Sequence, residues 1–183
     1  MPAMEAHLFW IVSRAAGTAA LLLSSAAVGV GLTMGGRLVK SRGVDLRATH
    51  EALSLATLIA IVVHAVALLG DSFLNASLLD ITLPFASGYK EPWMSIGIVS
   101  GWGLVALGVS YYFRTRIGVA RWKRLHRWTA LAWVLGIAHS LGEGTDAGTT
   151  WFLALTAIAV LPALGLLVVR HLPSTSTPSP SRT

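Results

Sequence analysis

The chain contains no cysteine among its 183 residues. Disulfides, thiolate-ligated haem, iron–sulfur clusters and cysteine nucleophiles are therefore excluded, and any metal must be held by His, carboxylate or Met side chains. Charged residues are also scarce, since they make up 12% of the chain, against about 25% in an average soluble domain. With 54% hydrophobic residues, such a chain cannot cover its apolar surface in water. The composition therefore predicts an integral membrane protein.

Five long apolar stretches are each close to the ~20 residues that a membrane-spanning helix needs. They run roughly over Leu8–Met34, His50–Leu69, Trp93–Phe113, Leu125–Leu141 and Trp151–Val169. We therefore expect an all-α fold, an integral membrane bundle of five transmembrane helices within residues 8–170. A short helix is expected near LLDITL in the loop after the second stretch. The Pro/Ser/Thr-rich tail, residues 171–183, is expected to be disordered on the cytoplasmic side.

The loops on the two sides differ in charge. Lys and Arg gather in the loops after the first and third stretches and in the tail, whereas the opposite side carries six of the eight acidic residues. Because basic loops stay in the cytoplasm, the N-terminus is predicted outside and the C-terminus inside. This bias explains the net charge of +6 without a nucleic-acid partner. The chain is predicted to lie in the lipid bilayer of a bacterial-type plasma membrane as a multi-pass protein.

Four histidines lie within the apolar stretches, which is costly unless they have a function. His50 and His64 belong to the second stretch, and His126 and His139 to the fourth. At 1.5 Å rise per residue, the members of each couple are about 21 and 20 Å apart along their helix. Both stretches are predicted to run from inside to outside. His50 should therefore lie at the depth of His126, and His64 at the depth of His139.

Two facing histidines on different helices are suited to haem iron, because neutral imidazoles can fill both of its axial positions. Cu or Zn usually requires more than two protein ligands. The pattern predicts an inner haem iron held by His50 and His126, and an outer haem iron held by His64 and His139. Two such groups would carry electrons across most of a ~30 Å hydrocarbon core. The alternative is that each histidine only packs and bonds a backbone carbonyl.

The spacing in the fourth stretch does not fit a regular helix. Fourteen steps of about 100° bring His64 back to within ~40° of His50, but thirteen steps leave His139 about 140° away from His126. We expect a bend, an irregular turn, or ligands presented on different flanks. Two tryptophans that flank the inner end of this stretch, Trp122 and Trp128, are expected at the membrane interface.

Arg14 lies within the first stretch, about two turns from its outer end. A guanidinium at that depth needs an anion, and a propionate of the outer haem is the candidate. The alternative is that Arg14 extends to the lipid headgroups. Glycines in the first and third stretches, among them Gly31, Gly97 and Gly101, are expected to allow close helix packing.

These residues resemble the ferric reductase-like transmembrane domain superfamily, which includes ferric reductases, the membrane part of NADPH oxidases and the haem subunit of the methionine sulfoxide reductase system. The likeness rests on H-x13-H and H-x12-H in the second and fourth stretches, and on RAAGTAALLL at 14–23, PFASGYKEPW at 84–93 and WKRLHR at 122–127. It covers nearly all of residues 8–170. The resemblance implies two b-type haems on the four histidines, Arg14 near the outer propionates, and electrons moving outward.

Larger relatives carry a flavin- and nicotinamide-binding domain after the last helix. Only a short tail follows Leu172, so no flavin site is expected in this chain. The donor is then a separate cytoplasmic flavoprotein reductase or a quinol, and the acceptor is ferric iron or a secreted redox protein. The chain is either an oxidoreductase resembling ferric reductases or an electron-transfer subunit of a separate extracytoplasmic oxidoreductase. A non-redox membrane scaffold or transporter is the third interpretation.

Overall fold

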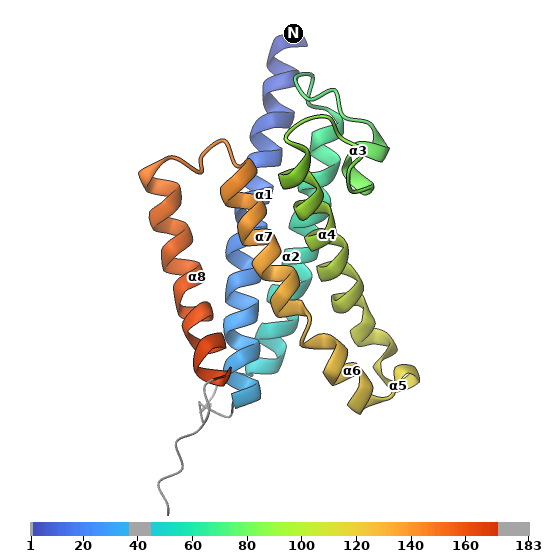
Figure 1. The fold of residues 1–183 in the computed structure, drawn as a ribbon, viewed down its shortest axis with the longest axis vertical. Helices are drawn as coiled ribbons and strands as arrows, with labels where there is room; N and C mark the ends of the chain where they lie inside the picture. The colour runs from blue at the N-terminus through green and yellow to red at the C-terminus, as the bar shows by residue number, and fades with distance from the viewer. Residues whose placement is uncertain (1, 37–44, 172–183) are drawn as a thin grey trace, which may run out of the picture.

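The computed structural model describes residues 2–36 and 45–171, and within these ranges it is helical with no strands (Figure 1). The helices are α1 (Pro2–Gly36), α2 (Leu46–Leu69), α3 (Leu78–Thr82), α4 (Glu91–Val109), the 3-10 turn η1 (Ser110–Phe113), α5 (Arg114–Ile117), α6 (Val119–His126), α7 (Thr129–Glu143) and α8 (Thr150–His171). The all-α prediction is confirmed, as is the short helix near LLDITL, which is α3. The predicted tail lies outside the described residues except for His171, which ends α8.

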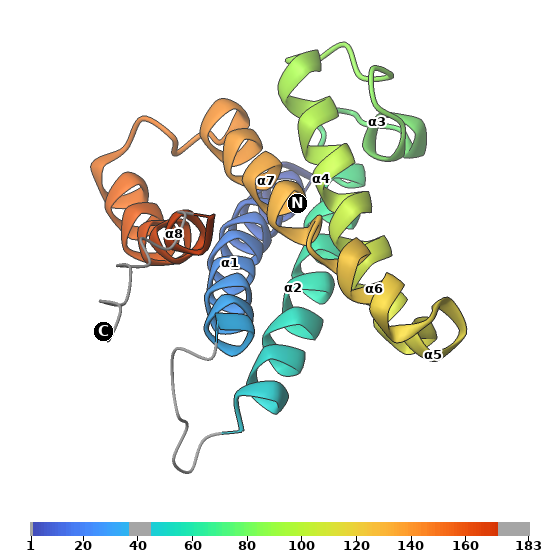
Figure 2. The same cartoon turned by 60° about the horizontal axis from the view of Figure 1, so that its bottom comes forward.

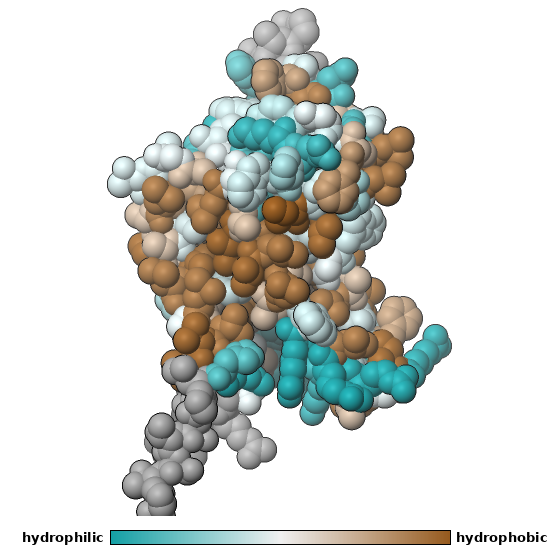
Figure 3. Space-filling model, viewed as in Figure 1, coloured by the Kyte–Doolittle hydropathy of each residue, from teal (hydrophilic) through white to brown (hydrophobic). Residues whose placement is uncertain are grey.

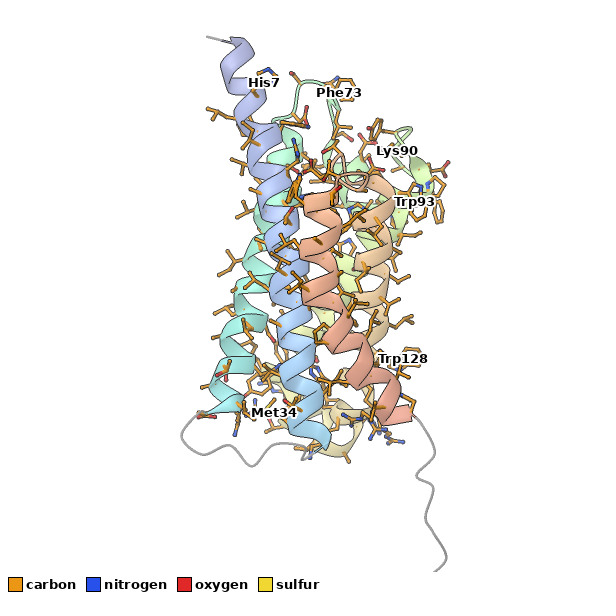
Figure 4. All side chains as sticks on the ribbon, turned by 90° about the vertical axis from the view of Figure 1, so that its left-hand side faces the viewer. His7, Met34, Phe73, Lys90, Trp93 and Trp128 are labelled. Atoms are coloured by element: carbon orange, nitrogen blue, oxygen red, sulfur yellow. The ribbon has the colours of Figure 1, made fainter. Side chains whose placement is uncertain are left out.

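The long helices form a bundle around α1. This helix packs most extensively on α2 and also contacts α7 and α8, while α4 packs on α7 (Figures 1 and 2). His7, Phe73, Lys90 and Trp93 lie at one end of the bundle, and Met34 and Trp128 lie at the other (Figure 4). The ends of the helices therefore alternate as the sequence predicts, with the N-terminal end of α1 on the same side as the loop between α2 and α4.

On the face shown in Figure 3, the surface of the bundle is apolar in the middle and more polar toward its two ends. Large apolar side chains such as Ile59, Ile158 and Leu161 are exposed, as expected for helices that face lipid. Four helical segments are long and apolar enough to cross a membrane: His7–Gly35, Leu46–Leu69, Glu91–Ile117 and Thr150–His171.

The fifth predicted span, Leu125–Leu141, is not one continuous helix. α6 ends at His126, Arg127 and Trp128 form a turn, and α7 begins at Thr129. The turn is tightened by bonds between residues three apart, from Trp128 N to Leu125 O and from Ala130 N to Arg127 O. The irregular turn is one of the options expected for this stretch. Since α7 has only 15 residues, fewer than the ~20 of a typical span, five spans and the orientation of the termini stay predictions.

The core lies where α1, α7 and α8 meet. Trp133 of α7 is 1% exposed and donates its indole N–H to Ser25 Oγ of α1 at 3.1 Å. Ser25 in turn donates to Leu21 O. On the other side of α7, Ser100 of α4 donates to Ala132 O at 2.7 Å. These bonds satisfy buried polar groups and hold α7 between α1 and α4.

Candidate functional site

The structure brings the four predicted histidines together as two pairs, which we call the inner pair (His50 and His126) and the outer pair (His64 and His139). The ring centroids are 6.2 Å apart in the inner pair and 6.3 Å apart in the outer pair. The ring planes cross at 89° and 71°. Two imidazoles that bind one metal ion at about 2 Å from each nitrogen have centroids roughly 6 Å apart. Both pairs therefore have the spacing of axial ligands on a shared iron.

Three of the four rings are fixed by a backbone carbonyl of a neighbouring helix or its end. The Nδ1 atoms lie at hydrogen-bonding distance from these carbonyls, which are Ala27 O for His50 (2.9 Å), Ser13 O for His64 (2.8 Å) and Trp93 O for His139 (2.8 Å). Because a carbonyl can only accept, Nδ1 carries the proton and Nε2 keeps its lone pair. Hydrogen bonding of this kind orients a metal-binding histidine and raises its basicity. Packing alone would also use these carbonyls, but it would not require the rings to face each other in pairs.

The same three rings lie against glycines. A Cβ atom at Gly17 would lie 3.0 Å from Nδ1 of His64, and one at Gly31 would lie 3.1 Å from Cε1 of His50. At Gly97 the corresponding distance to His139 Nδ1 would be only 2.5 Å. The close packing expected of Gly31 and Gly97 is thus packing against the histidines.

A role for Gly17 is not among the predictions from the sequence, although its spacing from Gly31 indicates one. Gly17 and Gly31 are separated by the same number of residues as His50 and His64. α1 and α2 run in opposite directions, so this matched spacing places one glycine opposite each histidine.

His126 is held differently. Its Nδ1 lies 3.5 Å from Thr129 Oγ1, at the limit of a hydrogen bond, and Thr129 itself donates to His126 O. The backbone of Leu107 in α4 is a further polar neighbour of the ring. One face of the imidazole stacks on Trp122, with centroids 5.0 Å apart and planes at 24°. Trp122 therefore does more than mark the end of a membrane stretch.

A cavity of about 590 Å³ surrounds the outer pair, within the ~300–1,000 Å³ range of ligand and cofactor sites. Its wall comes from α1, α2, α4 and α7, is mainly apolar, and includes His64, His139 and Arg14. A mainly apolar space with a histidine on each side suits a flat hydrophobic macrocycle. The donor set, the carbonyl-bonded rings and the glycines together fit a haem-type group.

Arg14 finds its anion within the chain. Its Nε donates to Asp146 Oδ2 at 3.0 Å, and its Nη2 donates to Oδ1 of the same carboxylate. The guanidinium also lies over the ring of Trp10, 4.1 Å from the centroid. The pair joins α1 to the loop after α7 and is only partly exposed, at 31% for Arg14 and 16% for Asp146. A contact between Arg14 and a cofactor carboxylate stays a prediction.

Three further ionisable residues, His7, His171 and Asp71, lie away from the pairs or have structural partners. His7 is exposed in the first turns of α1, and His171 bonds Leu167 O within α8. Asp71 is buried and accepts the backbone N–H groups of Phe73 and Leu74. Among the described residues, no three His, Asp or Glu side chains gather as a metal site.

Comparison with known proteins places this geometry in a family. No curated protein and no solved structure matches the chain. A known family matches residues 14–137, a segment that contains Arg14, His50, His64 and His126 and stops just before His139. Since the match covers more than half of the 183 residues, the chain belongs to the family of the ferric reductase-like transmembrane component.

Proposed function

We propose that the chain is a di-haem b protein that passes single electrons across the membrane. His50 and His126 ligate the inner haem iron, and His64 and His139 ligate the outer one. The observation that carries the proposal is the pair of ring spacings, 6.2 and 6.3 Å, between two histidines of α2 and one histidine each of α6 and α7. Membership of a family whose transmembrane domains bind haem supports it.

The ligand set favours electron transfer over binding of a small molecule at iron. A bound haem supplies a one-electron ferric/ferrous couple. Two histidines at each site would hold the iron from both sides and would leave no position for an outside ligand. The hydrogen bonds from Nδ1 to the carbonyls of Ala27, Ser13 and Trp93 hold three rings in one orientation, and rings held in this way would suit a group that only gains and loses an electron.

The direction of transfer and the partners are part of the proposal. The basic residues of α5 and α6 lie at the end near the inner pair, and by the positive-inside rule this end faces the cytoplasm. The inner pair would then lie on the side of the donor, a separate flavoprotein reductase or a quinol, and the outer pair on the side of the acceptor. The acceptor is ferric iron or a secreted redox protein. In the second case the chain is the haem subunit of a separate extracytoplasmic oxidoreductase.

An absorption spectrum of the purified protein tests the proposal. We expect a Soret band and b-type haem in a ratio of two per chain. His64→Ala or His139→Ala should each leave about one haem, and His50→Ala or His126→Ala should leave the other one. His171→Ala is the matched control, because this exposed ring bonds Leu167 O within α8 in the part of the chain that the structure describes, and it should keep both.

A protein made with ample haem that shows no Soret band would leave a scaffold or a transporter as the better interpretation. An unchanged ratio of haem to protein in all four variants would show that the ligand assignment is wrong.

A further inference from the structure

Three of the proposed ligands share one kind of support, and the fourth lacks it. His50, His64 and His139 each combine a glycine in contact with the ring and an Nδ1–carbonyl distance of 2.8–2.9 Å. For His126, the Nδ1 contact with Thr129 is 3.5 Å. His126 is also the last residue of α6 and precedes a turn, so the regular helix holds it on one side only. Its polar neighbours are Thr129 Oγ1 and the backbone of Leu107, and a stacked aromatic ring adds to them in setting the plane of the imidazole.

Trp122 is placed to do this. Residues four apart share a helix face, and the indole lies nearly parallel to the imidazole of His126 at 5.0 Å. Flat stacking resists rotation of the imidazole about its own axis, because rotation would drive a ring edge into the indole face.

The indole is itself anchored from the end of α4. Its Nε1 donates to Ser110 Oγ at 3.1 Å, and Ser110 donates to Leu107 O at 2.6 Å. The ring edge of Trp122 also meets Tyr111, 5.9 Å away at 62°. The phenol of Tyr111 accepts a hydrogen bond from Arg47 of α2 at 3.0 Å. Contacts from η1 and α2 therefore hold the indole in place, and the indole in turn contacts the ring of His126.

We propose that Trp122 is the positioning residue of the inner haem site: its stacking sets the plane of the His126 imidazole and keeps the free nitrogen directed at His50. The proposal rests on the proposed ligation of haem by His126. It gives the tryptophan of WKRLHR a role that an interfacial position does not explain.

The test compares Trp122→Ala and Trp122→Phe in the full-length haem protein. The readouts are haem per chain and the low-spin ferric EPR spectrum, which responds to the angle between the two axial imidazole planes. That angle is 89° in the inner pair. Trp122→Ala should change the inner signal and weaken retention of the inner haem about two- to tenfold, the range of one lost aromatic contact. Trp122→Phe keeps a flat ring and should restore both.

Trp128→Ala is the matched control, because this neighbouring tryptophan is 61% exposed. It should leave both haems and both signals as they are in the parent protein. The outer signal should stay constant in every variant. If Trp122→Ala does not accumulate, Trp122→Leu replaces it, since leucine occupies space there without a flat face.

An inner signal unchanged in Trp122→Ala or Trp122→Leu would overturn the proposal, as would an equal change in both signals or the same effect from Trp128→Ala. The proposed haem function and the proposed role of Trp122 can be refuted independently of each other. A parent protein without haem removes the proposed function, whereas a parent protein with two haems and an indifferent Trp122 removes only the role of this residue.

Discussion

At the scale of single residues, glycines of a neighbouring helix make the space for three of the four histidine rings. Gly17 and Gly31 make it on α1, and Gly97 makes it on α4, where a Cβ atom would lie 2.5 Å from His139 Nδ1. Real Cβ atoms do not come this close to another heavy atom, so any side chain at Gly97 must displace the ring or separate the two helices. The site therefore requires glycines at these positions as well as histidines at the ligand positions.

We expect Gly97→Ala to remove most of the outer haem and to leave the inner one. The added methyl group displaces His139 from its bond to Trp93 O, and overpacking of this kind costs about 1–3 kcal/mol. Haem per chain, measured from the reduced spectrum, should fall from two toward one. Gly165→Ala, on α8, is the control, because a Cβ there would meet nothing within 4 Å. Equal haem contents in the two variants would refute the role of Gly97.

Removal of either charge of the Arg14–Asp146 ion pair should shift the midpoint potential of the outer haem, and the two shifts should be opposite in sign. A positive charge near the outer iron favours its reduced form, and a negative charge favours its oxidised form. Arg14→Ala should therefore lower the outer midpoint potential, and Asp146→Asn should raise it. A unit charge roughly 10–15 Å away, at an effective dielectric constant of about 20, is worth about 1–2 kcal/mol, which is some tens of millivolts for one electron.

A redox titration that resolves the two haems measures this effect. The double variant should lie near the parent value, because the pair is removed as a unit. The inner haem, about 20 Å deeper by the helix rise, should move much less. Shifts of the same sign in both single variants would contradict the electrostatic explanation.

The residues of the site were predictable from the sequence to different degrees. The four histidines and their pairing follow from spacing, because rise per residue converts sequence distance into depth. The partners of Nδ1 do not, since every residue has a carbonyl and nothing in the sequence marks the one that accepts. Asp146 was visible as an acid in an outer loop, but its contact with Arg14 depends on how α1 and α7 pack.

At the scale of elements, the decisive feature is the turn at Arg127 and Trp128. From the 140° mismatch between His126 and His139, the sequence predicted a bend, an irregular turn or ligands on different flanks, without deciding among them. No glycine or proline stands at the turn, and these are the residues that usually mark a helix break. The break follows from tertiary contacts, because α7 is held by Ser25 and Ser100 on its two sides, whereas α6 turns away toward α5 (Figure 1).

Insertion of one alanine between Arg127 and Trp128 should disrupt the inner site and leave the outer site intact. An added residue rotates the preceding segment, α6, by about 100° relative to α7 and shifts it along the helix axis by about 1.5 Å. Because α7 is fixed in the core, the displacement falls on α6, and we expect His126 to lose its position opposite His50. The inner haem should be lost and the outer one kept. An alanine inserted after Gly148, in the loop before α8, is the control and should keep both. A full complement of haem in the first variant would show that the turn carries no constraint.

At the scale of the whole molecule, the structure agrees with the predicted membrane bundle, whereas the predicted number of five spans stays a prediction. Exposed apolar side chains around the middle of the bundle agree with lipid as its solvent (Figure 3). Hydropathy cannot tell a continuous span from a shorter helix next to an amphipathic one, and this is the difference between the stretch Leu125–Leu141 and the observed α6 and α7. α7 nonetheless packs on α4 and α1, so a shortened fifth span remains compatible with the bundle.

The last prediction concerns the orientation of this bundle in the membrane. The chain has no native cysteine, so single cysteines can be introduced and labelled with an impermeant reagent without a background. Thr115→Cys lies in the basic segment α5, and Gly148→Cys lies in the loop between α7 and α8, where an added side chain meets open space. If basic segments stay in the cytoplasm, intact cells should label Gly148→Cys only, and Thr115→Cys should react only after the membrane is opened. Labelling of both positions from the same side would mean that the segment between them, α6 and α7, does not cross the membrane. The reverse labelling would place the inner pair on the outside and invert the direction of electron flow.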